Sequence, residues 1–293
     1  MFVDAIEKAA EFTRPIHIVR RNFGSTEIIP STATLFFVND EGWALTCGHV
    51  TDGLLYIQKK EQHYQNFKTE IAKITEHNKK KIEKQIQKKY GYDKPTTVQL
   101  KCRFMQCIEG NFEFIIERHE QYDIALIKFN NFTRLRCSSF PVFPADTTGL
   151  KPGRMLCRLG YPFPEYTNFT YNATTDDIEW TQSGQLYTPA FPIEGMLTRY
   201  LDDGNKKIFG FELSTPGLRG QSGGPAFDAD CKVWGMQSET NHLDLDFDIE
   251  RNVVRGATKK IVKDSSFLHV GHCVHVDIIK AFMRDKGVNF IEK

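Results

Sequence analysis

Alternating apolar and polar residues dominate the chain outside one central stretch. Such alternation favours half-buried β-strands bounded by turns. Strands are predicted over residues 15–20, 32–38, 43–47 and 98–129, with a strand–turn–strand unit over residues 226–235. Helical periodicity predicts a short amphipathic helix over residues 3–11 and a closing helix over residues 276–286. The pattern is therefore mostly β, with helices at both ends.

The central stretch, residues 56–90, contains neither glycine nor proline. Its apolar residues recur at helical spacing, namely Tyr64, Phe67, Ile71, Ile74, Ile82, Ile86 and Tyr90. This spacing predicts a helical insertion over about residues 56–94. An unbroken helix would be roughly 50 Å long. A break near His77 and Asn78 would instead give a helical hairpin, and the pattern leaves both open.

Charge separates this insertion from the rest of the chain. Residues 56–94 contain 11 lysines and 5 acidic residues, a net charge of +6, whereas the remainder has 27 basic and 32 acidic residues, a net charge of −5. The insertion is either a solvated helix with one packed stripe or a docking surface for an acidic protein, nucleic acid or anionic membrane. It lacks arginine, which disfavours bidentate phosphate recognition.

A serine flanked by glycines, Ser222, is the strongest chemical signal. The segment has the G-x-S-x-G pattern, in which glycine permits the backbone to turn its N–H groups toward a developing oxyanion. This pattern occurs in α/β-hydrolases, where a helix follows the serine and the acid and histidine come later. Here Pro225 and a strand pattern follow the serine, and the candidate partners precede it. The order His49, Asp123, Ser222, with gaps of 74 and 99 residues, is that of double-barrel proteases.

Several blocks resemble one family in the same order along the chain. They are residues 36–50, 123–126, 153–162 and 220–225, with a weaker match over residues 270–276. The chain resembles trypsin-like (chymotrypsin-fold) serine proteases, in particular the disulfide-free bacterial branch that includes the high-temperature-requirement proteases, without an appended PDZ domain. The resemblance covers roughly residues 15–55 and 98–290.

This resemblance implies an all-β fold of two six-stranded antiparallel β-barrels, with a long helical insertion after the histidine and a C-terminal helix. The expected division is an N-terminal barrel over residues 1–139, a linker over 140–152, and a C-terminal barrel with the terminal helix over 153–293. Residues 162–188 are expected to form loops over the cleft between the barrels. Residues 244–264 are a second insertion, first acidic and then basic.

The resemblance also implies the roles of the site residues in a serine endopeptidase. Ser222 would be the nucleophile, His49 the general base and then acid, and Asp123 the group that orients His49. The backbone N–H groups of Gly220 and Ser222 would form the oxyanion hole. Ser238 is expected to donate a hydrogen bond to Asp123.

The family's specificity pocket maps onto a small set of residues: Pro216, Gly217, Ser238, Glu239, Thr240 and Gly271. Pro216 stands at the floor, where an acid would select a basic substrate side chain. Gly271 is expected to leave the back of the pocket open, with Cys273 beyond it. We therefore expect an uncharged, small-to-medium apolar residue at P1, the substrate position before the scissile bond.

Gln221 replaces the aspartate that captures a freed N-terminus in secreted digestive relatives, so that mode of activation is not expected. Control would instead act through ordering of the loop over residues 214–220, or through a bound partner. The alternative function is a weakly active or inactive protease-fold module that binds a partner through the lysine-rich helix.

The remaining sequence features concern the environment of the protein. The chain has no run of 18 apolar residues and begins without a secretory signal pattern. Its seven cysteines are odd in number and scattered, which favours reduced thiols and a cytoplasmic location. His269, Cys273 and His275 share a face of a predicted strand, but the matching family strand holds no metal, so neither zinc nor another cofactor is expected. No sequence feature predicts an oligomeric state.

Overall fold

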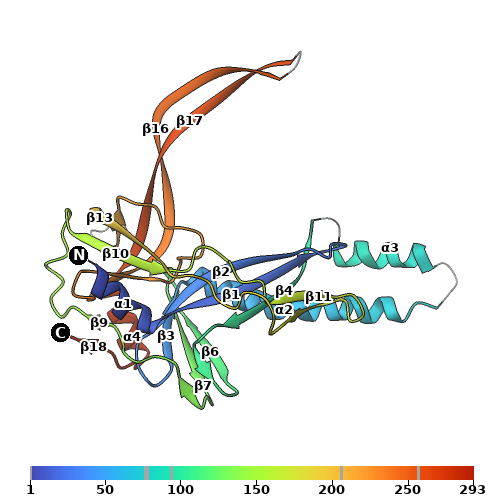
Figure 1. Cartoon of the computed structure of the whole chain (residues 1–293), viewed down its shortest axis with the longest axis horizontal. Coiled ribbons are helices and arrows are strands. Elements are labelled where there is room, and N and C mark those ends of the chain that lie inside the picture. Colours follow the sequence, from blue (N-terminus) through green and yellow to red (C-terminus); the bar gives the residue numbers. More distant parts are fainter. Residues whose placement is uncertain (1, 76–78, 93–94, 205–206, 256–257) are drawn as a thin grey trace.

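Two six-stranded antiparallel sheets form the body of the protein in a computed structural model that describes residues 2–75, 79–92, 95–204, 207–255 and 258–293 (Figure 1). In sheet order, the first consists of β4 (Thr97–Phe104), β1 (Thr13–Asn22), β2 (Ile28–Phe37), β3 (Trp43–Thr46), β7 (Ala125–Asn130) and β6 (Glu113–Arg118). The second is a closed barrel of β10 (Met155–Gly160), β13 (Phe191–Asp202), β14 (Ile208–Leu213), β17 (Thr258–His275), β16 (Val233–Arg255) and β15 (Pro225–Phe227). The predicted fold class is confirmed.

Three small sheets and two terminal helices complete the body. The sheets pair β11 (Phe169–Asn172) with β12 (Asp177–Trp180), β18 (Ile291–Glu292) with β9 (Val142–Phe143), and β5 (Ile108–Glu109) with β8 (Arg134–Leu135). The helices α1 (Val3–Phe12) and α4 (Val276–Asp285) confirm the two predicted terminal helices. Helix α4 begins where Nδ1 of His275 accepts a hydrogen bond from the Asp277 N–H. Within the described residues, no helix combines the length and apolar character needed to cross a bilayer.

A tight turn before β3 sets the direction of the strand that leads to His49. The side-chain oxygen of Asn39 accepts hydrogen bonds from the N–H groups of Glu41 and Trp43. Gly42 has φ +87°, and a Cβ there would lie 2.7 Å from the Phe132 ring. Both the backbone conformation and the close ring therefore require glycine at this position.

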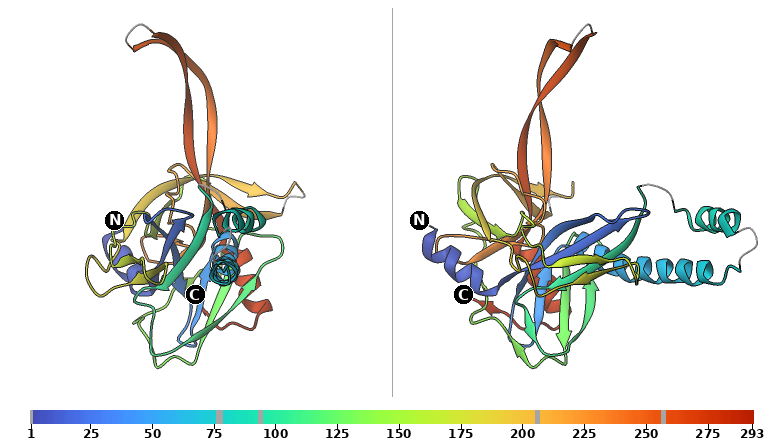
Figure 2. Two further views of the ribbon diagram at one scale, coloured as in Figure 1. Left: turned by 90° about the vertical axis from the view of Figure 1, so that its right-hand side faces the viewer. Right: turned by 45° about the vertical axis from the view of Figure 1, so that its right-hand side comes forward.

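The insertion is a helical hairpin of α2 (Gly48–Ala72) and α3 (Lys79–Tyr90), which projects away from the barrels (Figures 1 and 2). The predicted apolar stripe forms its own cluster, in which Tyr64, Phe67 and Ile86 are buried and Phe23, beyond the end of β1, packs against them. The hairpin alternative is confirmed, and the unbroken helix is wrong. The first helix also begins at Gly48 rather than near residue 56, while residues 76–78 and 93–94 lie outside the described part.

Most of residues 162–188 pack on the first sheet and do not form the loops over the cleft that were expected from sequence. The exception is the start of the segment, where Pro162 and Pro164 line a pocket with Arg219. The Tyr166 ring stacks on buried His17 of β1 at 3.8 Å. Asp176, in the turn between β11 and β12, pairs with Arg21 of β1 at 2.8 Å, and Asp177 pairs with Lys101 of β4 at 2.7 Å. These contacts hold the segment against the outer side of the first sheet.

The second insertion extends a barrel hairpin into a long arm. Strands β16 and β17 pair from Gly235 and His275 outward to Arg255 and Thr258, and the ribbon rises clear of the closed barrel and of the first sheet (Figures 1 and 2). The pairing register shifts between Asp244 and Asp248. The base of this arm belongs to the barrel and carries residues that line the candidate site.

Candidate active site

His49 lies in the first turn of α2, immediately after the strand β3. Gly48 before it leaves room for Arg118, because a Cβ there would lie 1.9 Å from the guanidinium carbon and would displace that side chain. After β3 the chain passes beneath Arg118 and enters α2. The His49 side chain in its first turn is half exposed. This arrangement fixes the backbone of His49 from both sides.

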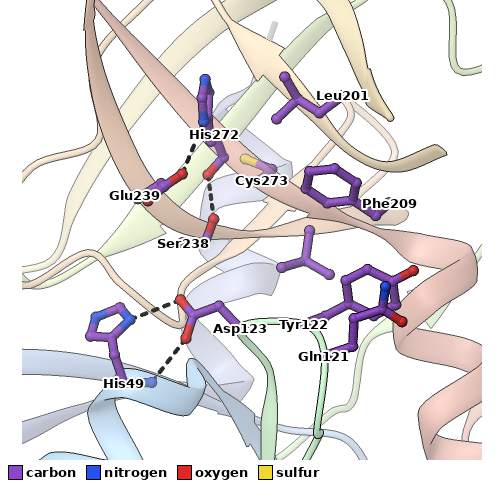
Figure 3. A pocket seen from close by; sticks show the side chains of 11 residues that line it. His49, Gln121, Tyr122, Asp123, Leu201, Phe209, Ser238, Glu239, His272 and Cys273 are labelled. Atoms are coloured by element: carbon purple, nitrogen blue, oxygen red, sulfur yellow. Dashed lines mark hydrogen bonds and ion pairs between the residues drawn. The ribbon is translucent and has the colours of Figure 1, made fainter. Parts of the chain in front are cut away.

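Asp123 holds both the ring and the backbone of His49 (Figure 3). Its Oδ2 lies 2.8 Å from His49 Nδ1, and its Oδ1 accepts the His49 N–H at 2.9 Å. The carboxylate therefore also caps the N-terminus of α2, where the helix dipole favours negative charge. Arg118 adds a cation 3.9 Å from Oδ1.

These contacts move both pKa values in the direction that a general base needs. The hydrogen bond to Asp123 raises the pKa of His49 above its usual 6.5, against the opposing effect of burial. Burial alone would raise the pKa of Asp123, but the hydrogen bonds from the His49 ring and backbone N–H outweigh it, and the net pKa falls below 3.8. Asp123 is therefore ionised at neutral pH, accepts the Nδ1 proton, and leaves Nε2 free to take another.

Ser222 sits in a turn that glycine makes possible. Its neighbour Gly223 has φ +89°, and a Cβ there would lie 2.1 Å from the Thr34 carbonyl oxygen. The Ser222 hydroxyl donates to the carbonyl oxygen of Ser238 at 3.1 Å. In the part of the chain that the structure describes, this is its one hydrogen bond, so Ser222 and His49 are not hydrogen-bonded to each other in this state.

The predicted oxyanion loop is held by the side chain of Gln221, which is fully buried. Its Oε1 accepts the Leu218 N–H at 2.9 Å, and its Nε2 donates to the Phe191 carbonyl at 3.0 Å. Gly220 has φ +103°, and its carbonyl accepts the Thr34 hydroxyl at 2.7 Å. Among the described residues, the N–H groups of Gly220 and Ser222 have no acceptor, so both are available to an oxyanion.

A pocket of about 540 Å³ adjoins His49 and Asp123 (Figure 3). Its lining includes Tyr122 and Phe209, and Figure 3 shows His272 and Glu239 on its opposite wall, 3.2 Å apart. The Ser238 hydroxyl donates to the His272 carbonyl at 3.0 Å rather than to Asp123, so that sequence expectation is wrong. Asp123 is instead satisfied by the two His49 donors.

A second pocket, of about 490 Å³, is lined in part by Ser222. Its lining contains most of the predicted specificity residues, namely Pro216, Gly217, Ser238, Glu239 and Thr240, together with Leu218, Arg219, Ser222, Gln237, His242 and His269. The space behind Gly271 is not open as expected, because a Cβ there would lie 2.0 Å from Nη1 of Arg158. A guanidinium group from β10 therefore fills that space.

Comparison with known proteins shows the family of the chain. The sequence profile described as the trypsin-like peptidase domain matches residues 33–236. The chain belongs to the trypsin-like peptidase family. A search of curated proteins found no match. Among solved structures, an HtrA-type protease, a variant form of AlgW with a tripeptide, aligns with a TM-score of 0.48 at 11% identity; the alignment covers 97% of this chain and 62% of the other.

The three residues that suggested a metal site serve different parts of this peptidase domain. His269 shares a hydrogen bond with His242 at the pocket mouth. Cys273 is buried with its sulfur 3.8 Å from Oε1 of Gln237, and His275 caps α4. The one group of three metal-type ligands that converges within the described residues is Cys47 with His49 and Asp123, at the candidate site itself.

Sequence reasoning missed three residues that shape the site: Thr34, Arg118 and Arg158. Thr34 accepts the Tyr161 N–H and donates to Gly220, which ties the two sheets together beside the oxyanion loop. Arg118 packs over Gly48, and Arg158 lies behind Gly271. All three act across long sequence separations, and their local sequence carries no motif that would single them out.

Proposed function

We propose that the chain is a serine endopeptidase that uses His49, Asp123 and Ser222 as a catalytic triad. The observation that carries this proposal is the double hydrogen bond from His49 to Asp123. It fixes the imidazole tautomer, with Nδ1 protonated and Nε2 free. The serine in its glycine turn lines the neighbouring pocket, which shares Ser238 and Glu239 with the pocket of His49.

In the proposed reaction, the Ser222 hydroxyl leaves the Ser238 carbonyl by rotation about χ1 and attacks the scissile carbonyl carbon. His49 Nε2 takes the hydroxyl proton and then gives it to the leaving amine, which yields an acyl-enzyme. Water repeats the same steps on the ester and releases the acid. The unpaired N–H groups of Gly220 and Ser222 would bind the oxyanion, and one such donor is typically worth about 3–4 kcal/mol.

Regulation by a partner is part of the proposal. The Ser222 hydroxyl donates its hydrogen bond to the Ser238 carbonyl and not to His49. This is expected of a site in which the serine must still rotate before it can react. Helix α2 is continuous from the triad histidine into the insertion. A partner that shifts or orders the insertion would therefore also shift the backbone of His49. We favour an acidic protein as the partner, because eight lysines of the hairpin are exposed: Lys59, Lys73, Lys79, Lys80, Lys81, Lys84, Lys88 and Lys89.

Labelling with a small fluorophosphonate, combined with digestion of a proteome-derived peptide library, tests the triad. Wild type should be labelled at Ser222 and should cut, and Ser222→Ala should do neither, with turnover lower by roughly 10⁶-fold. Equal cleavage by both forms would remove Ser222 from the mechanism. Partner control predicts that the wild-type labelling rate rises when an acidic protein binds and falls back at high salt.

The second candidate is the weakly active binding module, which the resting hydrogen bond of Ser222 favours. It predicts that wild type is not labelled even with an acidic partner bound to the hairpin.

All seven cysteines are free thiols in the structure, and we propose on that basis that the protein works in a reducing, cytoplasmic environment.

A further inference from the structure

Arg158 of β10 is a fully buried cation without a counter-charge. Its Nη1 donates to Oε1 of Gln237 at 2.5 Å, and its Nη2 donates to the hydroxyl and carbonyl of Thr215 at 2.5 and 2.9 Å and to the Pro216 carbonyl at 3.2 Å. These acceptors are all neutral, and its Nε has no partner. In the described part of the chain, no carboxylate forms an ion pair with it. Because guanidinium stays protonated in proteins and a buried ion loses several kcal/mol of solvation, this charge requires an explanation.

The acceptors of Arg158 belong to the wall of the pocket beside Ser222. Pro216 and Gln237 both line that pocket. Two glycines make room for the Arg158–Gln237 pair: a Cβ at Gly271 would lie 2.0 Å from Nη1, and a Cβ at Gly217 would lie 2.1 Å from Nε2 of Gln237. The cation thus lies directly behind the surface that would contact a substrate's P1 side chain.

Arg158 also fixes which end of the Gln237 amide faces the pocket. Because Oε1 is bound to the guanidinium, the NH₂ group lies against Gly217. The NH₂ group donates one hydrogen bond to the Glu239 carbonyl at 2.7 Å, and its other N–H has no acceptor among the described residues. Gln237 is among the residues that line the pocket, so this second N–H is the donor that it can offer there, with the Arg158 charge behind the amide.

The other ionisable residues of the pocket give it little negative charge. Arg219, His242 and His269 are basic, and the two histidines share a hydrogen bond through their Nδ1 atoms. The acid at the rim, Glu239, has a 72% exposed side chain and pairs with His272, which lines the neighbouring pocket. A carboxylate in this pocket would meet donors and cations, whereas an ammonium group would meet like charge.

We propose that this pocket selects an acidic P1 side chain, glutamate or aspartate, with Gln237 as the direct donor and Arg158 as the buried counter-charge. This proposal rests on the proposed peptidase function and replaces the uncharged P1 expected from sequence. The floor residue Pro216 carries no charge, but its carbonyl holds the Arg158 guanidinium. The counter-charge thus lies one layer behind the residues that line the pocket.

Peptide diphenyl phosphonates that differ only in their P1 residue test this proposal. Each forms a bond from Ser222 Oγ to phosphorus and releases phenol, so its rate of labelling reports P1 preference without needing peptide turnover. With Glu, Asp, Gln, Leu and Lys at P1, we expect Glu or Asp to react roughly 10- to 100-fold faster than Gln. This is the scale of an unlike charge pair roughly 6–12 Å apart, with Gln237 between the charges, at an effective dielectric constant of about 20. Lys should be slowest.

The informative variant is Gln237→Glu, which places a carboxylate on Arg158 with little change in shape. It neutralises the cation without exposing it, so the Glu-to-Gln ratio should fall to one or below. The readout is a ratio of two reagents on one variant, so a general loss of Ser222 reactivity affects both rates and leaves the ratio interpretable. Arg158→Met should lose the same preference, provided that it folds. Gln182→Glu makes the same charge change at an exposed site and should keep the wild-type ratio.

The outcomes separate this proposal from the proposed function. If the fluorophosphonate labels wild type but P1 Glu reacts no faster than Gln or Leu, or if Gln237→Glu keeps the acid preference, then Arg158 is only a structural clamp for the 215–216 loop and the inference is wrong. If no reagent labels Ser222, even with an acidic partner present, the proposed peptidase function is wrong, and the specificity proposal that depends on it is wrong as well.

Discussion

The buried amide of Gln221 offers the most direct test of how the catalytic loop is held. In Gln221→Leu, the Leu218 N–H loses its acceptor and the Phe191 carbonyl loses its donor. An orphaned buried group costs about 1–3 kcal/mol, and both of these groups are partly accessible to water, so each should lie near the lower limit. The expected loss in free energy of unfolding is therefore about 2 kcal/mol, measured by urea denaturation.

The same loss should act on catalysis, because the loop from Leu218 to Gln221 carries the Gly220 N–H. If the two hydrogen bonds hold the loop in its competent conformation, removing about 2 kcal/mol shifts that equilibrium by up to roughly 30-fold. The fluorophosphonate labelling rate and kcat should fall together by at most this factor. The fall should be smaller than the roughly 10²- to 10³-fold effect of deleting an oxyanion donor outright.

Gln182→Leu is the matched control, since this glutamine is exposed and should tolerate the change with little effect on either measurement. The reasoning would be refuted if Gln221→Leu lost about 2 kcal/mol of stability but kept the wild-type labelling rate. In that case the amide supports the barrel and not the loop geometry. A variant with unchanged stability would show that water replaces both hydrogen bonds at no cost.

Three further predictions concern the same site and its surroundings. Asp123→Asn removes the main cause of the raised His49 pKa, so the pH at which activity is lost on acidification should move down while turnover falls by about 10⁴-fold, as a pH–rate profile would record. Gly223→Ala combines φ +89° with a Cβ 2.1 Å from the Thr34 carbonyl oxygen and should cost about 2–4 kcal/mol, seen as a lower Tm or as insoluble protein. Burial raises the pKa of the Cys102 and Cys137 thiols to about 11, so a thiol reagent at pH 8 should label the native protein slowly and reach all seven cysteines only in denaturant; fewer than seven would indicate a disulfide.

The features that the sequence predicts are those written in contiguous residues. The triad candidates stand out because each lies in a short motif at a strand end, and the geometry around His49 and Asp123 follows from those motifs. The helical stripe was likewise readable from spacing. The start of α2 could not be predicted, because Gly48 and Gly53 are poor helix formers and break the apolar pattern. The first turn is stabilised by Asp123, a residue far along the chain.

The features that the sequence hides depend on residues that meet only after folding. Residues 162–188 looked like cleft loops because nothing local reveals that Asp176 matches Arg21 on β1. Arg158 looked like an ordinary strand residue, since the groups that hold it, Thr215 and Gln237, lie more than 50 residues away. Gly217 and Gly271 look like ordinary turn or strand-edge glycines in the sequence. Only the folded structure shows that they leave the space that Arg158 and Gln237 occupy.

The continuity of α2 links the two halves of the proposed function. An ordinary docking appendage could be joined to an enzyme by a flexible loop, which would isolate the active site from events at the appendage. Here one helix carries His49 in its first turn, and its later turns pack on Phe23 and α3 through Tyr64 and Phe67. Because a helix resists bending within its hydrogen-bonded length, a partner that changes this packing changes the constraint on the imidazole as well. In the proposed function, the helix α2 would therefore take part both in binding the partner and in positioning His49 for catalysis.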